Sequence, residues 1–337
     1  MQAIVCRKPG ELAIEERPEP RPGETEALIA VRRIGICGTD YHIYEGSHPY
    51  LQYPRVIGHE LSGEVLKAPR GGALKPGDTV VVNPYLSCGA CVACRKGKPN
   101  CCVRIAVLGV HCDGGMCERI SAPESNLYPA RGLNLDQAAS VEFLAIGAHA
   151  VARSSLKPGA RTLVIGAGPI GLGAALFARL AGGDVTIMDR DVERLAFALD
   201  AEIAARSIEG GDHTADAVSE ATGGDGFDFI FDATGNRASM ESAFGYVAHG
   251  GTLVLIGVLA TSLSFSDPEF HKREMTVMGS RNALRADFET VMTAIERDRV
   301  PLKRLITHRT SLTGVTKDLP HWTTHKAGLV KALVEVG

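Results

Sequence analysis

Two stretches near the start of the 337-residue sequence carry side chains that bind metal ions. Cys37 lies in the first stretch, and the adjacent pair His59 and Glu60 lies in the second. A thiolate, an imidazole and a carboxylate form the mixed ligand set of a catalytic zinc, which keeps one coordination position open. Glu142 is a second carboxylate candidate, because it lies where the first part of the chain gives way to the second. We therefore predict an open zinc site at Cys37 and His59, with Glu60 or Glu142 as the carboxylate.

Each of these residues also has an ordinary structural interpretation. Cys37 alone would be a small buried side chain, and Glu60 alone would be an ion-paired strand residue. A second metal motif downstream favours the metal site over both alternatives.

That second motif is a run of cysteines with short, regular spacing. The sequence contains nine cysteines, and clustered cysteines in a chain of this size are more often metal ligands than disulfide partners. Four thiolates suit a closed, tetrahedral structural zinc. The predicted ligands are Cys88, Cys91, Cys94 and Cys102, and Cys101 is an alternative for the fourth position. The other cysteines are predicted to be small core or loop residues: Cys6, Cys101, Cys112 and Cys117.

A glycine-rich turn in the middle of the chain matches the dinucleotide-binding pattern G-x-G-x-x-G. Its residues are Gly166, Ala167, Gly168, Pro169, Ile170 and Gly171. The turn follows an apolar run and opens a helical one, and Asp189 ends the next predicted strand, as the pattern requires. The helix N-terminus would hold the pyrophosphate. Asp189 would accept from ribose hydroxyls and repel a 2′-phosphate, so NAD is preferred over NADP, although Arg190 partly offsets this.

Composition limits the kinds of protein that this chain can be. The hydrophobic fraction of 45%, the charged fraction of 22% and the net charge of -3 are those of an ordinary globular protein. They argue against a general role on nucleic acids or membrane surfaces. The length suggests about two domains. The N-terminus lacks the architecture of a signal peptide, so we expect a cytoplasmic protein.

Two patterns of secondary structure divide the chain. Residues 1–143 contain short apolar runs, such as 27–31 and 79–82, bounded by proline and glycine, which favours a barrel of short strands. Beyond them, strands alternate with helices, which predicts a doubly wound parallel sheet. The expected strands are 161–165, 184–188, 205–208, 227–233, 252–259 and 275–278. The expected helices are 144–155, 170–181, 192–199, 238–248 and 287–297.

The order of these motifs resembles the zinc-containing medium-chain dehydrogenases/reductases of the alcohol dehydrogenase superfamily, in particular their sorbitol, threonine and sugar-acid dehydrogenase branch. The resemblance covers nearly the whole chain. It implies an α/β protein with a GroES-like β-rich catalytic domain at residues 1–143 and 284–337, and a Rossmann NAD-binding domain at 144–283. It also implies one catalytic and one structural zinc per chain, and a homodimer or homotetramer.

The resemblance also implies roles for particular residues. Cys37 and His59 match zinc ligands, and Glu60 and Glu142 match carboxylates that bind the metal, its water or the substrate. Thr39 and His42 match a proton relay; a helix-end hydrogen bond to backbone is the alternative for His42. The cofactor contacts implied or expected are those of the glycine turn together with Asp189, Arg190, Arg194, Gly257 and Arg281.

The expected reaction is hydride transfer to NAD from a secondary alcohol of a polyol or sugar acid, such as an aldonate of the gulonate, galactonate or altronate type. Arg281 can bind a carboxylate through two hydrogen bonds, and Asn282 can bind a hydroxyl. Arg281 contacting the cofactor or pairing with a glutamate is the alternative. The loop 44–54, with Tyr44 as a substrate contact, is expected to line the pocket. His48 in this loop is expected to be a solvent-facing residue, and a substrate contact is the alternative.

Three other functions fit the sequence less well. A threonine or simple alcohol dehydrogenase of the same superfamily is the nearest alternative. A zinc-free reductase would lack Cys37, His59 and the four cysteines. A catalytically silent NAD-binding redox sensor would not need an open metal site.

Overall fold

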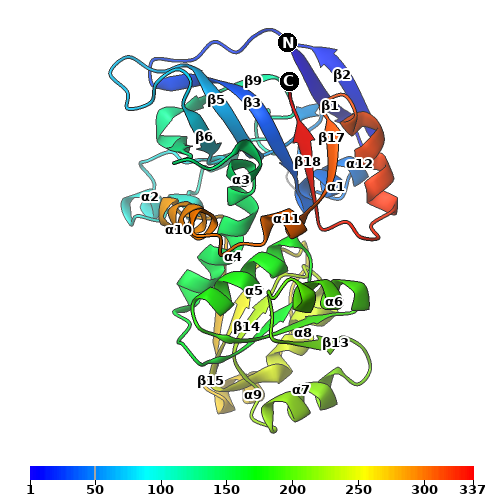
Figure 1. Ribbon diagram of the computed structural model, residues 1–337. Helices are drawn as coiled ribbons and strands as arrows, with labels where there is room; N and C mark the ends of the chain where they lie inside the picture. Colours follow the sequence, from blue (N-terminus) through cyan, green and yellow to red (C-terminus); the bar gives the residue numbers. More distant parts are fainter. Residues whose placement is uncertain (49–50) are drawn as a thin grey trace. The chain divides into compact units, whose positions relative to one another are not determined.

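The computed structural model describes residues 1–48 and 51–337 (Figure 1). The chain forms two compact units, each of which is described separately. The first comprises Met1–Glu142 together with Val291–Gly337, and the second comprises Phe143–Thr290. Within the described residues, none of the helices has the length and apolar character that crossing a bilayer requires.

The first unit is built mainly from β-strands. A seven-stranded sheet has the order β10-β6-β5-β3-β18-β17, with β9 also paired to β3, and a three-stranded sheet has the order β2-β1-β4. The strands are β1 Gln2–Lys8, β2 Glu11–Glu16, β3 Glu26–Ile36, β4 Arg55–Val56, β5 Glu60–Lys67, β6 Thr79–Val82, β9 Arg119–Pro123, β10 Leu127–Pro129, β17 Ile306–Ser311 and β18 Lys331–Glu335. A separate two-stranded ribbon pairs β7 Tyr85–Leu86 with β8 Ala106–Val107.

Strand β3 is the centre of the larger sheet and determines where the site forms. It pairs with β5 so that Gly35 lies opposite Glu60, and with β18 so that Ile36 lies opposite Ala332. The end of β3, the start of β5 and the start of β18 therefore meet at one edge. This pairing brings together residues that are far apart in the sequence.

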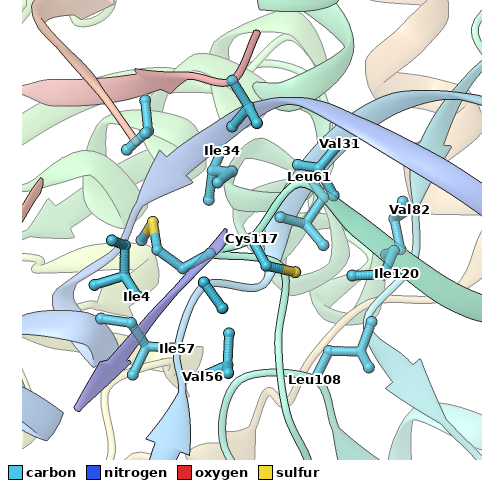
Figure 2. Close-up of a cluster of buried hydrophobic side chains, with 14 of the residues drawn as sticks. Ile4, Val31, Ile34, Val56, Ile57, Leu61, Val82, Leu108, Cys117 and Ile120 are labelled. Carbon is cyan, nitrogen blue, oxygen red and sulfur yellow. The ribbon is translucent and has the colours of Figure 1, made fainter. Parts of the chain in front are cut away.

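A continuous apolar core fills this unit. Ile4, Ile34 and Ile57 are fully buried, and they point toward one another from β1, β3 and the segment before β5 (Figure 2). β-Branched side chains suit this position because they pack well on a pleated surface. The core fixes the strand register, since a slip of one residue would turn every apolar side chain outward.

Helices complete the first unit at a few points. They are α1 Gly38–Glu45, α2 Val92–Arg95, α3 Leu135–Ala139, α11 Leu302–Leu305 and α12 Val315–Thr324. Helix α1 starts directly after Cys37 and ends at Gly46, which adopts the left-handed conformation that glycine favours. Helices α4 Val141–Ser154 and α10 Arg285–Glu296 each run across a boundary between the units.

The second unit confirms the predicted doubly wound sheet. Its six strands are all parallel, in the order β13-β12-β11-β14-β15-β16. They are β11 Arg161–Ile165, β12 Asp184–Asp189, β13 Arg206–Glu209, β14 Phe227–Asp232, β15 Val247–Leu255 and β16 Thr276–Gly279. The order reverses between β11 and β14, and ligands of such sheets bind outside the carboxyl ends of the strands at that point.

Some boundaries in this unit differ from the prediction. Strand β15 begins at Val247 rather than at residue 252, because the glycine pair 250–251 lies inside the strand, at a register shift opposite β14. Helix α8 Arg237–Ala243 accordingly ends earlier than predicted. Helices α5 Pro169–Leu180 and α6 Val192–Asp200 lie where they were expected, while α7 Thr214–Thr222 and α9 Asp267–Lys272 were not predicted.

Candidate metal centres and nucleotide site

Three side chains with metal-binding atoms converge where β3 ends and β5 begins. The Cys37 sulfur, a ring nitrogen of His59 and a carboxylate oxygen of Glu60 all lie within 4.8 Å of one another. His59 and Glu60 are buried, while Cys37 is half-buried. The structure thus brings together the sulfur, nitrogen and oxygen donors that the sequence singled out.

Asp40 fixes the two backbone segments that carry these side chains. Its carboxylate is fully buried and accepts hydrogen bonds from Cys37 N at 2.9 Å and from Gly58 N at 3.1 Å. One carboxylate therefore joins the start of α1 to the residue before His59. The sequence analysis missed this role; an acidic residue three positions after the residue that opens a helix was the available signal.

Glu60 has a buried cationic partner in the last strand of the chain. Lys331 opens β18 with 1% of its surface exposed, forms an ion pair with Glu60 Oε2, and donates to the Ile36 carbonyl at 2.9 Å. Gly35 makes room for this arrangement, because a Cβ atom there would lie 2.0 Å from Glu60 Oε2. Lys331 was not predicted; a lysine within the apolar run 329–334 was the signal that could have identified it.

Glu142 lies outside the group of three donors, but its charge interacts with that of His59. It is 3% exposed at the start of α4, and its Oε1 accepts a hydrogen bond from the Tyr85 hydroxyl. Burial raises the pKa of Glu142 to about 7, against the opposing effect of His59. Burial also raises the pKa of Tyr85, so its phenol remains a donor.

The electrostatics of the group favour a bound cation. Burial lowers the pKa of His59, but Cys37, Asp40 and Glu142 outweigh it and raise that pKa well above its usual value. Surroundings that stabilise a proton on an imidazole also stabilise a metal ion there. Within residues 1–48 and 51–337, His59 Nδ1 is buried without a hydrogen-bond partner. The donor set therefore fits a zinc ion with mixed ligands.

The two predicted relay residues lie in different surroundings. Thr39 Oγ1 is 3.8 Å from Cys37 Sγ, at the start of α1, and so lies beside the donor group. His42 lies in the last turn of α1 with 62% of its side chain exposed, and its Nδ1 is 3.2 Å from Ser47 Oγ. That contact is with a side chain, not with the backbone group proposed as the alternative.

The loop 44–54 is described only in part. Residues 49–50 lie outside the described residues, so its role as a pocket wall stays a prediction. Tyr44 is half-buried and packs against the apolar core of the first unit. His48 is also half-buried, and burial lowers the pKa of its imidazole.

The four sulfur atoms of the cysteine run form a second, closed group. The Cys91 sulfur lies 3.5 Å from that of Cys94 and 3.8 Å from that of Cys102, and the Cys88 sulfur belongs to the same group. A tetrahedron with metal–sulfur bonds of about 2.3 Å has edges of about 3.8 Å, so these separations fit a zinc ion. Cys101 is exposed and is not part of the group.

Nearby hydrogen-bond donors lower the pKa of two of these thiols. The Ala90 N–H group and the Arg104 side chain lower the pKa of Cys88 to about 6. The N–H groups of Cys94 and Val103 lower the pKa of Cys91 to about 7. Thiolates stabilised in this way are the form that binds zinc.

The second unit has a cavity of about 470 Å³ at the carboxyl ends of β11 and β12. Gly166, Gly168, Asp189, Arg190 and Arg194 are among its lining residues. The lining also contains residues that were not predicted from the sequence, from the loops after β13 and β14, the start of α7, α8 and the 3-10 turn that follows α8: Gly210, Gly211, Thr214, Thr234, Asn236, Ser239 and Tyr246.

The glycine turn has the backbone geometry that a phosphate site needs. Gly166 has φ of 99°, a left-handed conformation, and Gly168 caps the N-terminus of the twelve-residue helix α5. A Cβ at Gly168 would meet nothing within 4 Å, so its backbone is open to a ligand. Pro169, Ile170 and Gly171 form the first turn of α5. These features fit the pyrophosphate of a dinucleotide.

Asp189 is held in place by the same turn. Its Oδ2 accepts from Ala167 N at 2.6 Å, and its Oδ1 accepts from Asp191 N at 3.0 Å. Arg194 lies one helical turn away, with its Nε 3.4 Å from Asp191 Oδ2. The carboxylate at the cavity wall is therefore oriented before any ligand arrives.

We expect Gly171→Ala to disrupt the glycine turn. A Cβ at this position would lie 1.7 Å from the Gly166 carbonyl oxygen, so the helix and the turn must separate. Titration of the protein with NADH, followed by fluorescence, should show binding weakened by at least tenfold. Gly211→Ala is the matched control, because a Cβ at this other lining glycine would meet nothing within 4 Å. Equal affinity in Gly171→Ala and the control would contradict the expectation.

The remaining predicted contacts lie at the ends of the later strands. Gly257 follows β15, and a Cβ there would lie 2.3 Å from Gly235 N, so the two loops approach closely. Arg281 and Asn282 follow β16; Arg281 is exposed, and Asn282 is half-buried with a left-handed φ of 53°. Gly257, Arg281 and Asn282 are not among the lining residues of the cavity.

Comparison with known proteins gives consistent similarities along the chain. Residues 23–132 match the alcohol dehydrogenase GroES-like domain, and residues 169–297 match the zinc-binding dehydrogenase domain. The sequence is 40% identical to L-galactonate-5-dehydrogenase of Escherichia coli (strain K12), over 99% of this chain and 98% of that protein. It is 33% identical to sorbitol dehydrogenase of Halalkalibacterium halodurans, over 89% of each chain.

The structure is similar to solved structures over the same extent. One is the alcohol dehydrogenase rspB from E. coli CFT073 in complex with NADH, with a TM-score of 0.93, 29% sequence identity and 99% coverage of both chains.

Proposed function

The chain belongs to the zinc-binding alcohol dehydrogenases with a GroES-like domain and is an oxidoreductase, and from this premise we propose that it oxidises a secondary alcohol of a polyol or sugar acid with NAD. The observation that carries the proposal is the convergence of Cys37, His59 and Glu60 at the ends of paired strands. A mixed donor set of this kind serves a catalytic zinc rather than a structural one.

The proposed cofactors are one zinc at this open site, one at the four-cysteine site, and NAD at the glycine turn. When bound, zinc supplies Lewis-acid polarisation of the substrate oxygen, and NAD supplies the hydride acceptor. Cys37 and His59 would hold the open-site metal, with Glu60 as the third donor. The ion pair with Lys331 holds the Glu60 carboxylate in place.

Two residues are suited to take up the hydroxyl proton of the substrate. Thr39 Oγ1 lies beside the Cys37 sulfur and can pass a proton onward, with His42 as the proposed exit to solvent. Glu142 is the alternative acceptor, because burial raises its pKa to about 7, close to the range in which a general base works best.

Support for a polyol or sugar-acid substrate comes from the relatives and from one side chain. The relatives described above are named for dehydrogenation of a sugar acid and of a polyol. Arg281 is the proposed partner of a substrate carboxylate, and Asn282 that of a hydroxyl. A threonine dehydrogenase is the second candidate, because the chain is also 34% identical to L-threonine 3-dehydrogenase of Saccharopolyspora erythraea.

A screen of NAD reduction tests the proposal. Aldonates, neutral polyols, threonine and simple alcohols are compared at equal concentration, with zinc measured on the same sample. Turnover confined to aldonates, with two zinc ions per chain, is the expected result. Preference for neutral polyols would remove the carboxylate role of Arg281, and preference for threonine would favour the second candidate. Absence of turnover on every class would leave an NAD-binding sensor as the better description.

We expect Asp189→Asn to shift cofactor preference toward NADP. The change removes the negative charge that would repel a 2′-phosphate and leaves Arg190 and Arg194 at the cavity wall. Like-charge contacts of this kind cost a few kcal/mol, so the ratio of kcat/KM for NAD to that for NADP should fall by about 10- to 100-fold. Asp212→Asn, an exposed carboxylate after β13, is the matched control. An unchanged ratio would contradict the ribose assignment.

We also propose a homodimer or homotetramer. Among the described strands of the second unit, β16 lies at the edge of the sheet, and Val277 on it is 41% exposed. An unpaired strand edge with an apolar side chain is a surface that proteins tend to cover. Light scattering coupled to size-exclusion chromatography measures the mass directly, and a monomer would contradict this proposal.

A further inference from the structure

We propose that Tyr85 is a positioning residue that holds Glu142 in one orientation for the reaction. The inference rests on the proposed function, in which Glu142 is the alternative acceptor of the substrate proton. Tyr85 was not selected by any motif in the sequence, and its place follows from the contacts of its hydroxyl and its backbone.

Both partners of the contact are buried. Tyr85 is 7% exposed and Glu142 is 3% exposed, and the phenol donates to Glu142 Oε1. A hydrogen bond to a charged acceptor away from water is stronger than one at the surface. Because the phenol engages Oε1, it restricts the orientation of the Glu142 carboxylate.

Tyr85 can act in this way because its own backbone is fixed. Its N–H group donates to Asn83 Oδ1 at 3.0 Å, and its carbonyl accepts from Asn126 Nδ2 at 3.1 Å. The same Asn126 amide donates to the Asn83 carbonyl at 3.0 Å. Two half-buried amide side chains thus hold the N–H group and the carbonyl of Tyr85.

Tyr85 lies in the two-stranded ribbon that flanks the four-cysteine segment on both sides. Tyr85 pairs with Val107 in the ribbon of β7 and β8, and Leu108 N donates to the Pro84 carbonyl at 3.1 Å. Cys88 follows β7 and Cys102 precedes β8, so the four-cysteine group and the β7–β8 ribbon belong to one segment of the chain. The pairing with Val107 is a further contact that holds the Tyr85 backbone.

The test is Tyr85→Phe, which removes the hydroxyl and keeps the ring. We expect kcat/KM for the alcohol to fall by about tenfold to a hundredfold, the effect of losing one hydrogen bond to a charged group. NADH affinity measured by fluorescence and zinc per chain should stay at wild-type values. Tyr128→Phe is the matched control: this phenol is also buried and accepts from Asn83 Nδ2 at 2.8 Å, while the Asn83 Oδ1 that accepts from Tyr85 N and the Tyr85–Glu142 contact are left in place.

A second variant separates positioning from a merely structural role. In a Glu142→Gln background, Tyr85→Phe should change kcat/KM by less than threefold, because the group that it positions has lost its charge. A loss in that background as large as in the wild type, or a loss in Tyr85→Phe no greater than in Tyr128→Phe, would overturn the inference. Failure of the proposed function is distinguishable, since the wild-type protein itself would then not reduce NAD with any alcohol.

Discussion

Replacing His59 with alanine should abolish turnover of the alcohol while NAD binding is retained. His59 is the buried nitrogen donor between Cys37 and Glu60, and without it the open site keeps too few ligands to hold zinc in a reactive geometry. Lewis-acid stabilisation by a metal contributes several kcal/mol, so kcat/KM should fall by about a thousandfold or more.

NADH affinity, zinc per chain and kcat/KM are measured together on this variant. His249→Ala is the matched control, since it removes an exposed histidine of the second unit. Zinc should fall from two ions per chain to one in His59→Ala and remain at two in the control. If His59→Ala kept its activity, or if it lost NAD binding together with zinc, the assignment of the open site would be wrong.

The second large effect is expected from Lys331→Met, and it concerns stability. Methionine removes the cation and leaves Glu60 buried with an uncompensated charge, since the pair is 1% and 0% exposed. Breaking a buried pair by removing one partner costs about 3–5 kcal/mol of unfolding free energy. The lysine also donates to the Ile36 carbonyl, so the variant loses one hydrogen bond between β18 and β3 as well.

Denaturant unfolding followed by circular dichroism measures this change. Lys317→Met, at an exposed position of α12, is the matched control and should unfold like the wild type. The double variant Lys331→Met with Glu60→Gln should recover part of the lost stability, because the buried charge is then removed as well. A Lys331→Met variant as stable as the control would show that Glu60 does not depend on this partner.

The doubly wound sheet could be predicted because its signals are local. Strand β11 was predicted with its observed bounds, 161–165, from an apolar run that leads into the glycine turn. The start of β15 could not be predicted, because glycine lowers local strand preference. Gly250 has a left-handed φ of 74°, at the register shift after which β15 resumes its pairing with β14 at Thr252.

The donors of the open site could be predicted for a different reason. Cys37, His59 and Glu60 are residue types that bind zinc, and the four-cysteine motif downstream favoured a metal site over their ordinary structural interpretations. The structure brings the three together through the pairing of β3 with β5. Lys331 reaches the same place through the pairing of β18 with β3, a contact between the two ends of the chain. Contacts of that range depend on the whole sheet, so the lysine within the apolar run 329–334 could at most have indicated a buried cation, not its partner.

Roles that need more than proximity stay predictions. His42 was chosen as a relay residue, and its exposed imidazole lies at the end of α1, in contact with Ser47 and Glu45. Tyr85 was overlooked because a single tyrosine before a cysteine run has no distinctive spacing. Glu142 was predicted from the sequence, but its hydrogen bond with Tyr85 forms only in the folded chain.

Removal of zinc by dialysis against a chelator, with zinc per chain and NAD-dependent alcohol oxidation measured on the same samples, tests most directly whether the open site carries the reaction. We expect turnover to fall in proportion to the zinc lost from the site of Cys37 and His59, and added zinc to restore it. Full turnover by protein without zinc would contradict a catalytic role of this site.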